Sequence, residues 1–572
     1  MKTINRFYLG MLSAMILLMS TSNSFTKDVY AEDQNKISLD YDKLTEEKEK
    51  PNILFILADD MGFSDLGCYG SEIQTPNLDR LAQNGVRMTG FTNTARCAPS
   101  RASILTGQSP YNAGIPNLPE WDTRTGAGYL SENVVTIPEV LGENGYETFM
   151  AGKWHLSKDL DVDQGNSWPL CRGFDKFYGT IPGGGSFFEP IRIWDQNTRI
   201  DELVKQDEDY YYTDAISDKM VEYIEENAKG DQPFFGYVAY TAPHFPLHAK
   251  EEDILKYEGV YDCGWDVIRE QRFEKQKEMG LIDPSWELAP THEYASGIQD
   301  WEDVTNKEYY VKSMQVYAAM IDCMDQGIGR ILNTLEETGE MDNTVIIFMS
   351  DNGSSAEVLA NQNYNIDEIG TDKSYNSVGA GWAQASATPF ALFKKFTHNG
   401  GIATPFIFYW EKLDSIEGGE IRYNKAQIHD IMPTILELTG SQYPETYNGH
   451  EIMPLIGDSI MPIILNDDKI RNEFFWEHEE SMAVQIGDWK LVKVKGYGWE
   501  LYNLKEDGTE SHNLIDLYPQ MAEILKNRYV EWSSEQNSGY GDNLMVNGNF
   551  ENSARYGSKH DGWSAWAPNG DL

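Results

Sequence analysis

The chain has 572 residues, of which 91 are acidic and 46 basic, and its formal net charge at pH 7 is −45. A surface this acidic repels polyanions, which excludes nucleic acids and anionic membranes as partners. It does not attract an anionic substrate either, so any anion site must carry its own local positive charge.

The N-terminal residues 1–31 have the pattern of a secretory signal peptide. A basic start, Met1–Arg6, precedes an apolar run over Phe7–Ser20, and cleavage after Ala31 satisfies the small-residue rule. The apolar run is too short for a membrane span, which needs about 20 apolar residues. We therefore expect an exported protein, secreted or periplasmic, without a membrane span. Residues 32–50 are polar and charged and predict a mobile leader.

Residues 51–455 form the large predicted domain, because short apolar runs alternate there with helix-like patterns, one of them over Asn77–Asn84. Such alternation indicates an α/β fold with a large, mostly parallel mixed sheet covered by helices on both faces. The buried-strand candidates are Ile53–Leu57, Tyr146–Met150, Phe234–Tyr240 and Val345–Met349.

Residues 456–540 predict a smaller C-terminal subdomain. Three segments alternate at period two between glycine turns, which is typical of an antiparallel sheet. A helix should follow from Pro519, since proline suits a first helical turn. The three segments are Ala483–Ile486, Lys490–Val494 and Glu500–Tyr502, and the helix stripe is Met521, Ile524, Leu525, Tyr529 and Trp532.

Residues 541–572 contain two segments, Asn543–Glu551 and Gly562–Trp566, that resemble the opening strands of carbohydrate-binding β-sandwich modules. A segment of this length cannot close a sandwich. The chain therefore either stops early in such a module or ends in a disordered tail.

Polar residues follow all four strand candidates of the large sheet. Asp59 and Asp60 follow the first strand, and Asp351 and Asn352 follow the last one. Lys153, His155 and His244 follow the other two strands. Ligands of open α/β sheets bind outside the carboxyl ends of the strands, so these side chains should share one site.

Asp59 and Asp60 are adjacent carboxylates that would repel each other strongly if buried without a cation. With Asp351 and Asn352 they offer only hard oxygen ligands, which favours Ca²⁺ or Mg²⁺ over zinc. Alone, an Asp-Asp pair also suits a helix cap, and Asp-Asn-Gly suits a hairpin turn. Their joint position after two strands favours the metal site.

The segment Ala95–Gly107 contains Cys97 in the pattern Cys-x-Pro-x-Arg, followed by small residues and Thr-Gly. It resembles the signature of the type I, formylglycine-dependent sulfatases of the alkaline phosphatase superfamily. The resemblance implies that a maturation enzyme converts Cys97 to Cα-formylglycine. A hydrated aldehyde offers one hydroxyl to attack sulfur and a second whose deprotonation expels sulfate. The alternative is a buried structural thiol.

The resemblance also implies the roles of several site residues. The matching family residues bind a divalent cation, usually calcium, together with the formylglycine; here they are Asp59, Asp60, Cys97, Asp351 and Asn352. Arg101 lies one helical turn after Cys97 and matches the arginine that holds the formylglycine.

Lys153 and His155 match the family motif Gly-Lys-Trp-His, in which both contact the formylglycine or the sulfate. His155 is the candidate for accepting the proton that releases sulfate. His244 matches the Pro-His-x-Pro histidine beside the leaving oxygen, which it should protonate. The implied substrate-binding set is Lys153, His244 and Lys394.

Lys394 matches the lysine of the family pattern Pro-Phe-Arg-x-Tyr-Lys, which His-Glu-Gly-Gly-Ile follows. In this chain Ala391 replaces the arginine and Asn399 replaces the glutamate, which weakens inferences about nearby substrate contacts. Lys395 competes with Lys394 for the assignment. His398 is expected to be structural or to line the substrate site, and His248, His292 and His478 receive no role.

Cys68, Cys171, Cys263 and Cys323 remain if Cys97 is converted. They could pair in an exported protein, but their spacing fixes no connectivity. We expect four free, buried thiols.

The resemblance spans residues 51 to about 535, and Lys256–Asp266 with Arg269 is similar to the arylsulfatase-like subgroup. We therefore expect an exported sulfatase that cleaves sulfated glycans or small aryl sulfates. One alternative is hydrolysis of phosphate or phosphonate monoesters, because the same scaffold hosts those activities. The other is a non-catalytic glycan-binding protein whose Cys97 is never converted.

Overall fold

The computed structural model describes residues 50–121, 128–295, 297–359, 362–413, 418–466 and 471–537. The predicted signal peptide, nearly all of the polar leader and the predicted carbohydrate-module segment lie outside these residues. The chain divides into two compact units after Lys50, and the described residues from Pro51 onward belong to the second. Within the described part, no helix is both long and apolar enough to cross a membrane.

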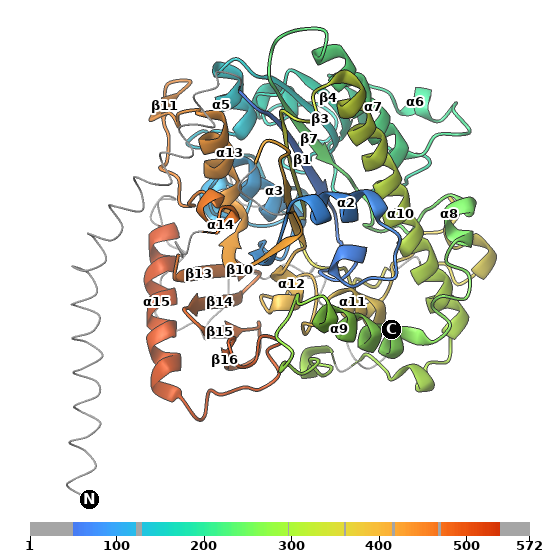
Figure 1. Ribbon diagram of the computed structural model, residues 1–572, viewed down its shortest axis with the longest axis vertical. Helices are drawn as coiled ribbons and strands as arrows, with labels where there is room; N and C mark the ends of the chain where they lie inside the picture. The colour runs from blue at the N-terminus through green and yellow to red at the C-terminus, as the bar shows by residue number, and fades with distance from the viewer. Residues whose placement is uncertain are drawn as a thin grey trace, which may run out of the picture. The chain divides into compact units, whose positions relative to one another are not determined.

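A ten-stranded mixed sheet forms the centre of this unit, in the order β10-β2-β9-β8-β1-β7-β3-β4-β5-β6 (Figure 1). The five strands from β8 to β4 run parallel to their neighbours within this block. Strand β9 runs antiparallel to both β2 and β8, and β5 and β6 add an antiparallel edge. The predicted α/β fold class is confirmed.

The strands of this sheet have the following bounds: β1 Asn52–Ala58, β2 Val86–Thr92, β3 Glu147–Lys153, β4 Lys176–Thr180, β5 Ile193–Asp195, β6 Thr198–Arg199, β7 Phe234–Ala239, β8 Thr344–Ser350, β9 Phe406–Tyr409 and β10 Glu420–Gln427. The helices that surround it are α2 Pro76–Asn84, α3 Cys97–Thr106, α4 Pro110–Ala113, α5 Ile137–Glu143, α6 Asp201–Val204, α7 Tyr212–Asn227, α8 Glu251–Leu255, α9 Gly264–Glu278, α10 Lys307–Thr338, α11 Ala380–Ser386, α12 Asn399–Ile402, α13 Ile431–Thr439 and α14 Met461–Ile464. A small antiparallel pair joins β11 Thr446–Tyr447 to β12 His450–Glu451.

Helices cover both faces of the large sheet: α7 and α10 lie on one side in Figure 1, and α3, α5 and α13 lie on the other. Strands β1 and β8 are buried along their whole length because both faces are covered. This burial explains why their sequences are continuous apolar runs without alternation.

The C-terminal subdomain is a four-stranded antiparallel sheet with one long helix. Its elements are β13 Glu473–His478, β14 Ser481–Ile486, β15 Trp489–Lys493, β16 Trp499–Asn503 and α15 Pro519–Asn537. The first strand was not predicted. Leu525 and Tyr529 face the sheet, but the predicted stripe residue Ile524 is 58% exposed and Ala522 is buried instead.

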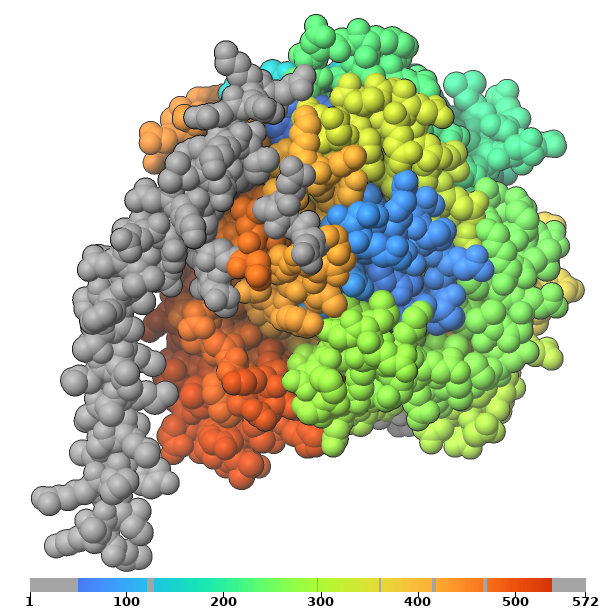
Figure 2. Space-filling model, in the orientation of Figure 1, coloured from blue at the N-terminus to red at the C-terminus, as the bar shows by residue number. Residues whose placement is uncertain are grey.

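The C-terminal subdomain lies beside the segment that follows α9. Figure 2 shows the red and green regions side by side on one face. The Thr509 hydroxyl donates to the Glu287 carbonyl across this boundary, and the Tyr294 hydroxyl donates to the Glu500 carboxylate. This contact brings the C-terminal sheet to the loops of the large sheet.

All five cysteines are free thiols. Cys68, Cys97 and Cys323 are buried, in line with the expectation for the first and third. The expectation was wrong for Cys171 and Cys263, which are exposed because they sit in surface turns around η3 Pro169–Arg172 and before α9.

Gly152 precedes Lys153, the last residue of β3, at the carboxyl edge of the sheet. Its φ is +122°, a region that side chains rarely adopt. A Cβ atom there would lie 1.9 Å from the Ala239 carbonyl oxygen of β7. The close β3–β7 approach therefore requires glycine.

We expect Gly152→Ala to lower the free energy of unfolding by about 1–3 kcal/mol, because strain and overpacking act at one position. Gly142→Ala is the matched control: it lies in α5 with open space around it, and should raise stability by up to about 1 kcal/mol. Chemical denaturation measures both. Equal stability of the two variants would contradict the requirement.

Candidate active site

The polar residues predicted at the strand ends meet at the carboxyl edge of the large sheet. Asp59 and Asp60 follow β1, Asp351 and Asn352 follow β8, and all four are buried. Cys97 is the first residue of α3, whose preceding residue Arg96 is extended. The positive end of this helix therefore faces the same edge and favours a bound anion.

Four buried oxygens at this edge suit a divalent cation. One oxygen each of Asp59, Asp60, Asp351 and Asn352 has no hydrogen-bond partner among the described residues. Ligand atoms of Asp59, Asp60 and His244 also lie within 4.8 Å of one another. Leaving such oxygens unsatisfied in a protein interior is costly. A hard, oxygen-binding cation such as Ca²⁺ or Mg²⁺ fits this donor set.

The other carboxylate oxygens pair with three buried cationic side chains. Lys153 Nζ lies 2.5 Å from Asp59 Oδ2, and Lys394 Nζ lies 2.5 Å from Asp60 Oδ1. Arg101 Nε lies 2.8 Å from Asp351 Oδ2. Each acid is thus anchored through one oxygen; the second oxygen of Asp59 and Asp351 stays available, and that of Asp60 lies 3.5 Å from His244 Nε2.

The electrostatics of the acids point to a missing positive charge. Burial raises the pKa of Asp351 to about 8, and the charge of neighbouring Asp59 adds to this effect. Burial also acts to raise the pKa of Asp59, but Lys153, His244 and Arg101 outweigh it and hold that pKa well below its usual range. A dication beside Asp351 would keep this carboxyl ionised at neutral pH.

The surroundings of Cys97 stabilise negative charge. Burial alone raises the pKa of its thiol, yet Lys153, Lys394 and His155 lower it well below its usual value. Arg101 donates through Nη1 to the Lys153 carbonyl oxygen at 2.8 Å, which fixes the lysine backbone beside α3. The position is therefore prepared to receive an anion.

Two histidines belong to this group of buried side chains: His155 acts on Cys97, and His244 Nε2 lies 3.5 Å from Asp60 Oδ2. His155 has a left-handed backbone (φ +59°), and its Nε2 lies 3.4 Å from Glu120 Oε1. Burial opposes protonation of His155, but Glu120 and then Cys97 raise its pKa. His244 donates from Nδ1 to the Phe245 carbonyl oxygen at 2.6 Å, and burial lowers its pKa.

Sequence reasoning missed two features of these histidines. Glu120, in η2 Pro119–Trp121, gave no motif signal. The run Gly183–Gly185 was visible in the sequence but not interpreted. A Cβ on Gly183 would lie 2.4 Å from the His155 ring, and one on Gly184 would lie 3.1 Å from the His244 ring. The glycines therefore let the backbone pack on both imidazoles.

The structure separates the two neighbouring lysines. Lys394 is buried against Asp60, whereas Lys395 turns outward, with φ +79°, and pairs with Glu357 at 2.6 Å. Only Lys394 therefore joins the buried charges around Cys97. This arrangement supports the expected assignment of Lys394 to the site.

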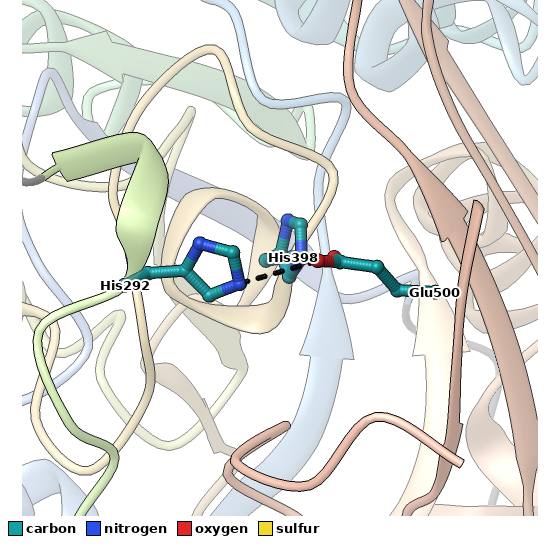
Figure 3. Close-up of side chains that lie close together, drawn as sticks. All are labelled: His292, His398 and Glu500. Carbon is teal, nitrogen blue, oxygen red and sulfur yellow. Dashed lines mark hydrogen bonds and ion pairs between the residues drawn. The ribbon is translucent and has the colours of Figure 1, made fainter. Parts of the chain in front are cut away.

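His398 takes part in a second cluster, which links three segments (Figure 3). The Glu500 carboxylate of β16 lies 2.9 Å from His398 Nε2 and 3.5 Å from His292 Nε2, and it accepts from the Tyr294 hydroxyl at 2.9 Å. The spacing of the His292, His398 and Glu500 ligand atoms could hold a metal ion. Because these partners already satisfy the carboxylate, we interpret the cluster as a clasp, and His398 as structural.

Comparison with known proteins identifies the family of this site. The model of the Sulfatase family matches residues 51–441, and the model described as N-sulphoglucosamine sulphohydrolase, C-terminal, matches residues 390–536. The chain belongs to the sulfatase family. The protein is a sulfatase, an enzyme that hydrolyses sulfate esters, as the sequence resemblance predicted.

Characterised and uncharacterised relatives extend over most of the chain. An uncharacterized sulfatase of Schizosaccharomyces pombe is 33% identical over 86% of this chain and 94% of its own. The arylsulfatase of Klebsiella aerogenes is 34% identical over 73% of this chain and 92% of its own. The crystal structure of Ps i-CgsB in complex with k-i-k-neocarrahexaose has a TM-score of 0.62 and 26% identity, covering 85% of this chain and 94% of that chain.

Lys394→Met should lower kcat/KM for an aryl sulfate by about 10²–10³, the usual loss when one preorganised charge donor is removed. Lys395→Met is the matched variant. Its loss of kcat/KM should be at least roughly tenfold smaller, because the Lys395 ammonium pairs with Glu357 and not with Asp60. Steady-state kinetics on folded variants, checked by circular dichroism, measure both. Equal losses would contradict the assignment.

The clasp should make stability depend on acid pH. Burial acts to raise the pKa of Glu500, but hydrogen bonds from His292 and His398 hold it well below its usual range. The stabilisation is therefore complete above the unfolded pKa, near 4.5, and is lost as pH falls below it.

We expect Glu500→Gln to be less stable than wild type at pH 7 and to lose less stability on acidification. The difference in slope is at most about 1.4 kcal/mol per pH unit, the value for one proton. Denaturation between neutral pH and pH about 3 measures it. The control is Glu473→Gln, in a half-exposed pair with Arg528, whose stability should depend on pH as that of wild type does. If the stability of Glu500→Gln fell with pH in parallel with that of wild type, the clasp would be refuted.

Proposed function

We propose that the protein is an exported sulfatase that cleaves sulfate monoesters of glycans, and also aryl sulfates, with a formylglycine derived from Cys97 and a divalent cation. One observation carries the proposal. Cys97 opens α3 amid three buried cationic side chains and four unpartnered ligand oxygens. Positive charge for an anion and oxygens for a cation therefore meet at the residue that the family modifies.

The cation, Ca²⁺ or Mg²⁺, would be held by Asp59, Asp60, Asp351 and Asn352, with an oxygen of the converted Cys97. When bound, it would polarise a sulfate oxygen and help to ionise the attacking hydroxyl. The chain's own contribution is to hold these ligands in place. Lys153, Lys394 and Arg101 do this through their pairs with the three carboxylates.

The converted Cys97 would supply the nucleophilic hydroxyl that the resemblance implies. Lys153 and Lys394 would neutralise the sulfate oxygens, because the charges of both ammonium groups act on Cys97. His155, oriented by Glu120, would accept the proton that releases sulfate. His244 would protonate the leaving oxygen from Nε2, since its Nδ1 proton is already donated to a carbonyl.

Relatives support the choice of substrate. The N-acetylglucosamine-6-O-sulfatase of Bacteroides thetaiotaomicron is 26% identical over 82% of this chain, and the Ps i-CgsB structure holds k-i-k-neocarrahexaose. The pattern of residues 1–31 supports export to the cell exterior or periplasm. Maturation would require a formylglycine-installing enzyme as a partner.

The protein purified from its native host should hydrolyse 4-nitrophenyl sulfate faster than 4-nitrophenyl phosphate. Exhaustive chelation should abolish the activity, and Ca²⁺ or Mg²⁺ should restore it, because the buried acids need a counter-charge. Steady-state rates on the paired esters measure the preference. Faster phosphate turnover would instead support the phosphate or phosphonate hydrolase.

Peptide mass spectrometry of the same preparation tests the modification. The tryptic peptide with Cys97 should show the mass change for replacing H₂S by O. Cys97→Ala should abolish turnover while leaving the fold intact. Full activity with an unmodified thiol would overturn the formylglycine proposal.

A further inference from the structure

We infer that a rim of six side chains around Cys97 binds the alcohol part of the ester, and that this part is a neutral, hydroxyl-rich sugar without a second anionic group. The inference rests on the proposed function and names its substrate class. The rim consists of Arg96, Phe245, Glu357, Tyr375, Lys395 and Glu479.

Each of the two rim cations is next to a site residue in the sequence. Arg96 precedes Cys97, and Lys395 follows Lys394. The Lys395 amide donates to the Ala95 carbonyl oxygen at 3.0 Å, so the two loops are joined. Ala95 and Lys395 both have left-handed backbones, with φ of +64° and +79°. The joined loops hold Arg96 next to Cys97 and hold Lys395 on the outer side of Lys394, where it pairs with Glu357.

Glu357 pairs with both of these cations. Its Oε1 lies 2.9 Å from Arg96 Nη1 and 2.6 Å from Lys395 Nζ. Burial opposes ionisation, but Arg96, Lys394 and Lys395 hold the pKa of Glu357 well below its usual range. This pairing leaves the cluster of Arg96, Lys395 and Glu357 with one net positive charge, which a second carboxylate can compensate.

Glu479 comes to the rim from the C-terminal subdomain, in the turn between β13 and β14, where its φ is +49°. It accepts from Asn117 Nδ2 at 3.2 Å. Burial acts to raise its pKa, but His478, Arg96 and Lys395 lower the pKa of Glu479 to about 2. A second ionised carboxylate thus faces the same two cations.

An aromatic wall continues the rim from the leaving-group side. The rings of His244 and Phe245 are 4.1 Å apart, and Phe245 meets Tyr375 edge-on at 6.4 Å. Tyr375 is 43% exposed, and burial and then the charge of Glu357 raise the pKa of its phenol. The wall therefore runs from the histidine beside the leaving oxygen to the charged half of the rim.

Exposure increases from the reacting residue outward. Cys97 and Lys394 are buried, whereas the side chains of Glu357, Lys395 and Glu479 are 19–22% exposed. A group esterified to sulfate at Cys97 would extend along these side chains. Paired carboxylates and cations accept from and donate to hydroxyl groups, and an aromatic ring packs on the apolar face of a sugar.

The charge of the rim selects against a second anion. Two cations and two carboxylates sum to zero, and the cations are already compensated. A further sulfate or carboxylate on the sugar would meet Glu357 and Glu479, while both cations of the rim are already paired, which is unfavourable. The matching substrate is a monosulfated neutral sugar.

The test compares three probes on the mature wild-type enzyme: 4-nitrophenyl sulfate, a panel of methyl hexopyranosides with one sulfate at each position, and the same sugars with a second sulfate. We expect at least one monosulfated sugar to exceed its disulfated counterpart by roughly tenfold or more in kcat/KM. This ratio is the scale of one charge-assisted hydrogen bond.

Glu479→Gln should lower kcat/KM for that sugar by about 10- to 100-fold, and at least tenfold more than for the aryl sulfate, because it weakens charged hydrogen bonds to hydroxyls. Tyr375→Ala, at an exposed position, should raise KM for the sugar more than KM for the aryl sulfate. Glu480→Gln is the matched control in the same turn, since Glu480 pairs with Lys495 at 3.3 Å, and it should behave like wild type.

Three outcomes overturn the inference while leaving the proposed function standing. In the first, the enzyme hydrolyses the aryl sulfate but no monosulfated sugar. In the second, it prefers disulfated sugars. In the third, both rim variants lose as much kcat/KM on the aryl sulfate as on the sugar. If wild type hydrolyses none of the sulfate esters, the proposed function fails first and the inference fails with it.

Discussion

Charge compensation inside the protein is the constraint on which the site depends. Asp59, Asp60 and Asp351 are fully buried at the carboxyl edge of the sheet, where an unpaired charge would be very costly. Three cationic side chains each neutralise one acid, but each bond uses only one carboxylate oxygen. The second oxygen of each carboxylate has no hydrogen-bond partner among the described residues, although His244 Nε2 lies 3.5 Å from that of Asp60, so a bound cation would complete the compensation. The same cations surround Cys97, which couples cation binding to anion binding.

A rigid sheet holds this arrangement against local backbone strain. Asp60, Ala95, His155 and Lys395 all adopt left-handed φ values without being glycine. Each such residue costs of the order of 1–3 kcal/mol and persists only where the surroundings determine it. Strands β1 and β8 supply that support, because they are buried along their full length and paired on both sides. The strain therefore turns side chains inward at Asp60 and His155 and outward at Lys395.

The C-terminal subdomain completes the loop that carries Lys394. Glu500 fixes His398, and Glu510 accepts from the Asn399 amide at 2.6 Å while it pairs with buried Lys490. Asn399 stands where the family pattern has a glutamate, and its backbone amide donates to a carboxylate from another part of the sequence. Glu479 reaches the rim from the same subdomain. A sheet distant in sequence thus contributes both to the stability of the loop and to the surroundings of the substrate.

The sequence by itself determined the α/β class, the strand ends and the residues that meet there, because short continuous apolar runs between turns indicate buried strands and the residues after parallel strands share one edge. It also identified Cys97 and Lys394 through contiguous motifs. Only the tertiary structure decided that Lys394 points inward and Lys395 outward, that Glu120 contacts His155, and that Glu357 and Glu479 flank Arg96. It also exposed Ile524, Cys171 and Cys263, against expectation. Local patterns do not encode these features, because each depends on loops that are far apart in the chain and meet only when the two sheets pack.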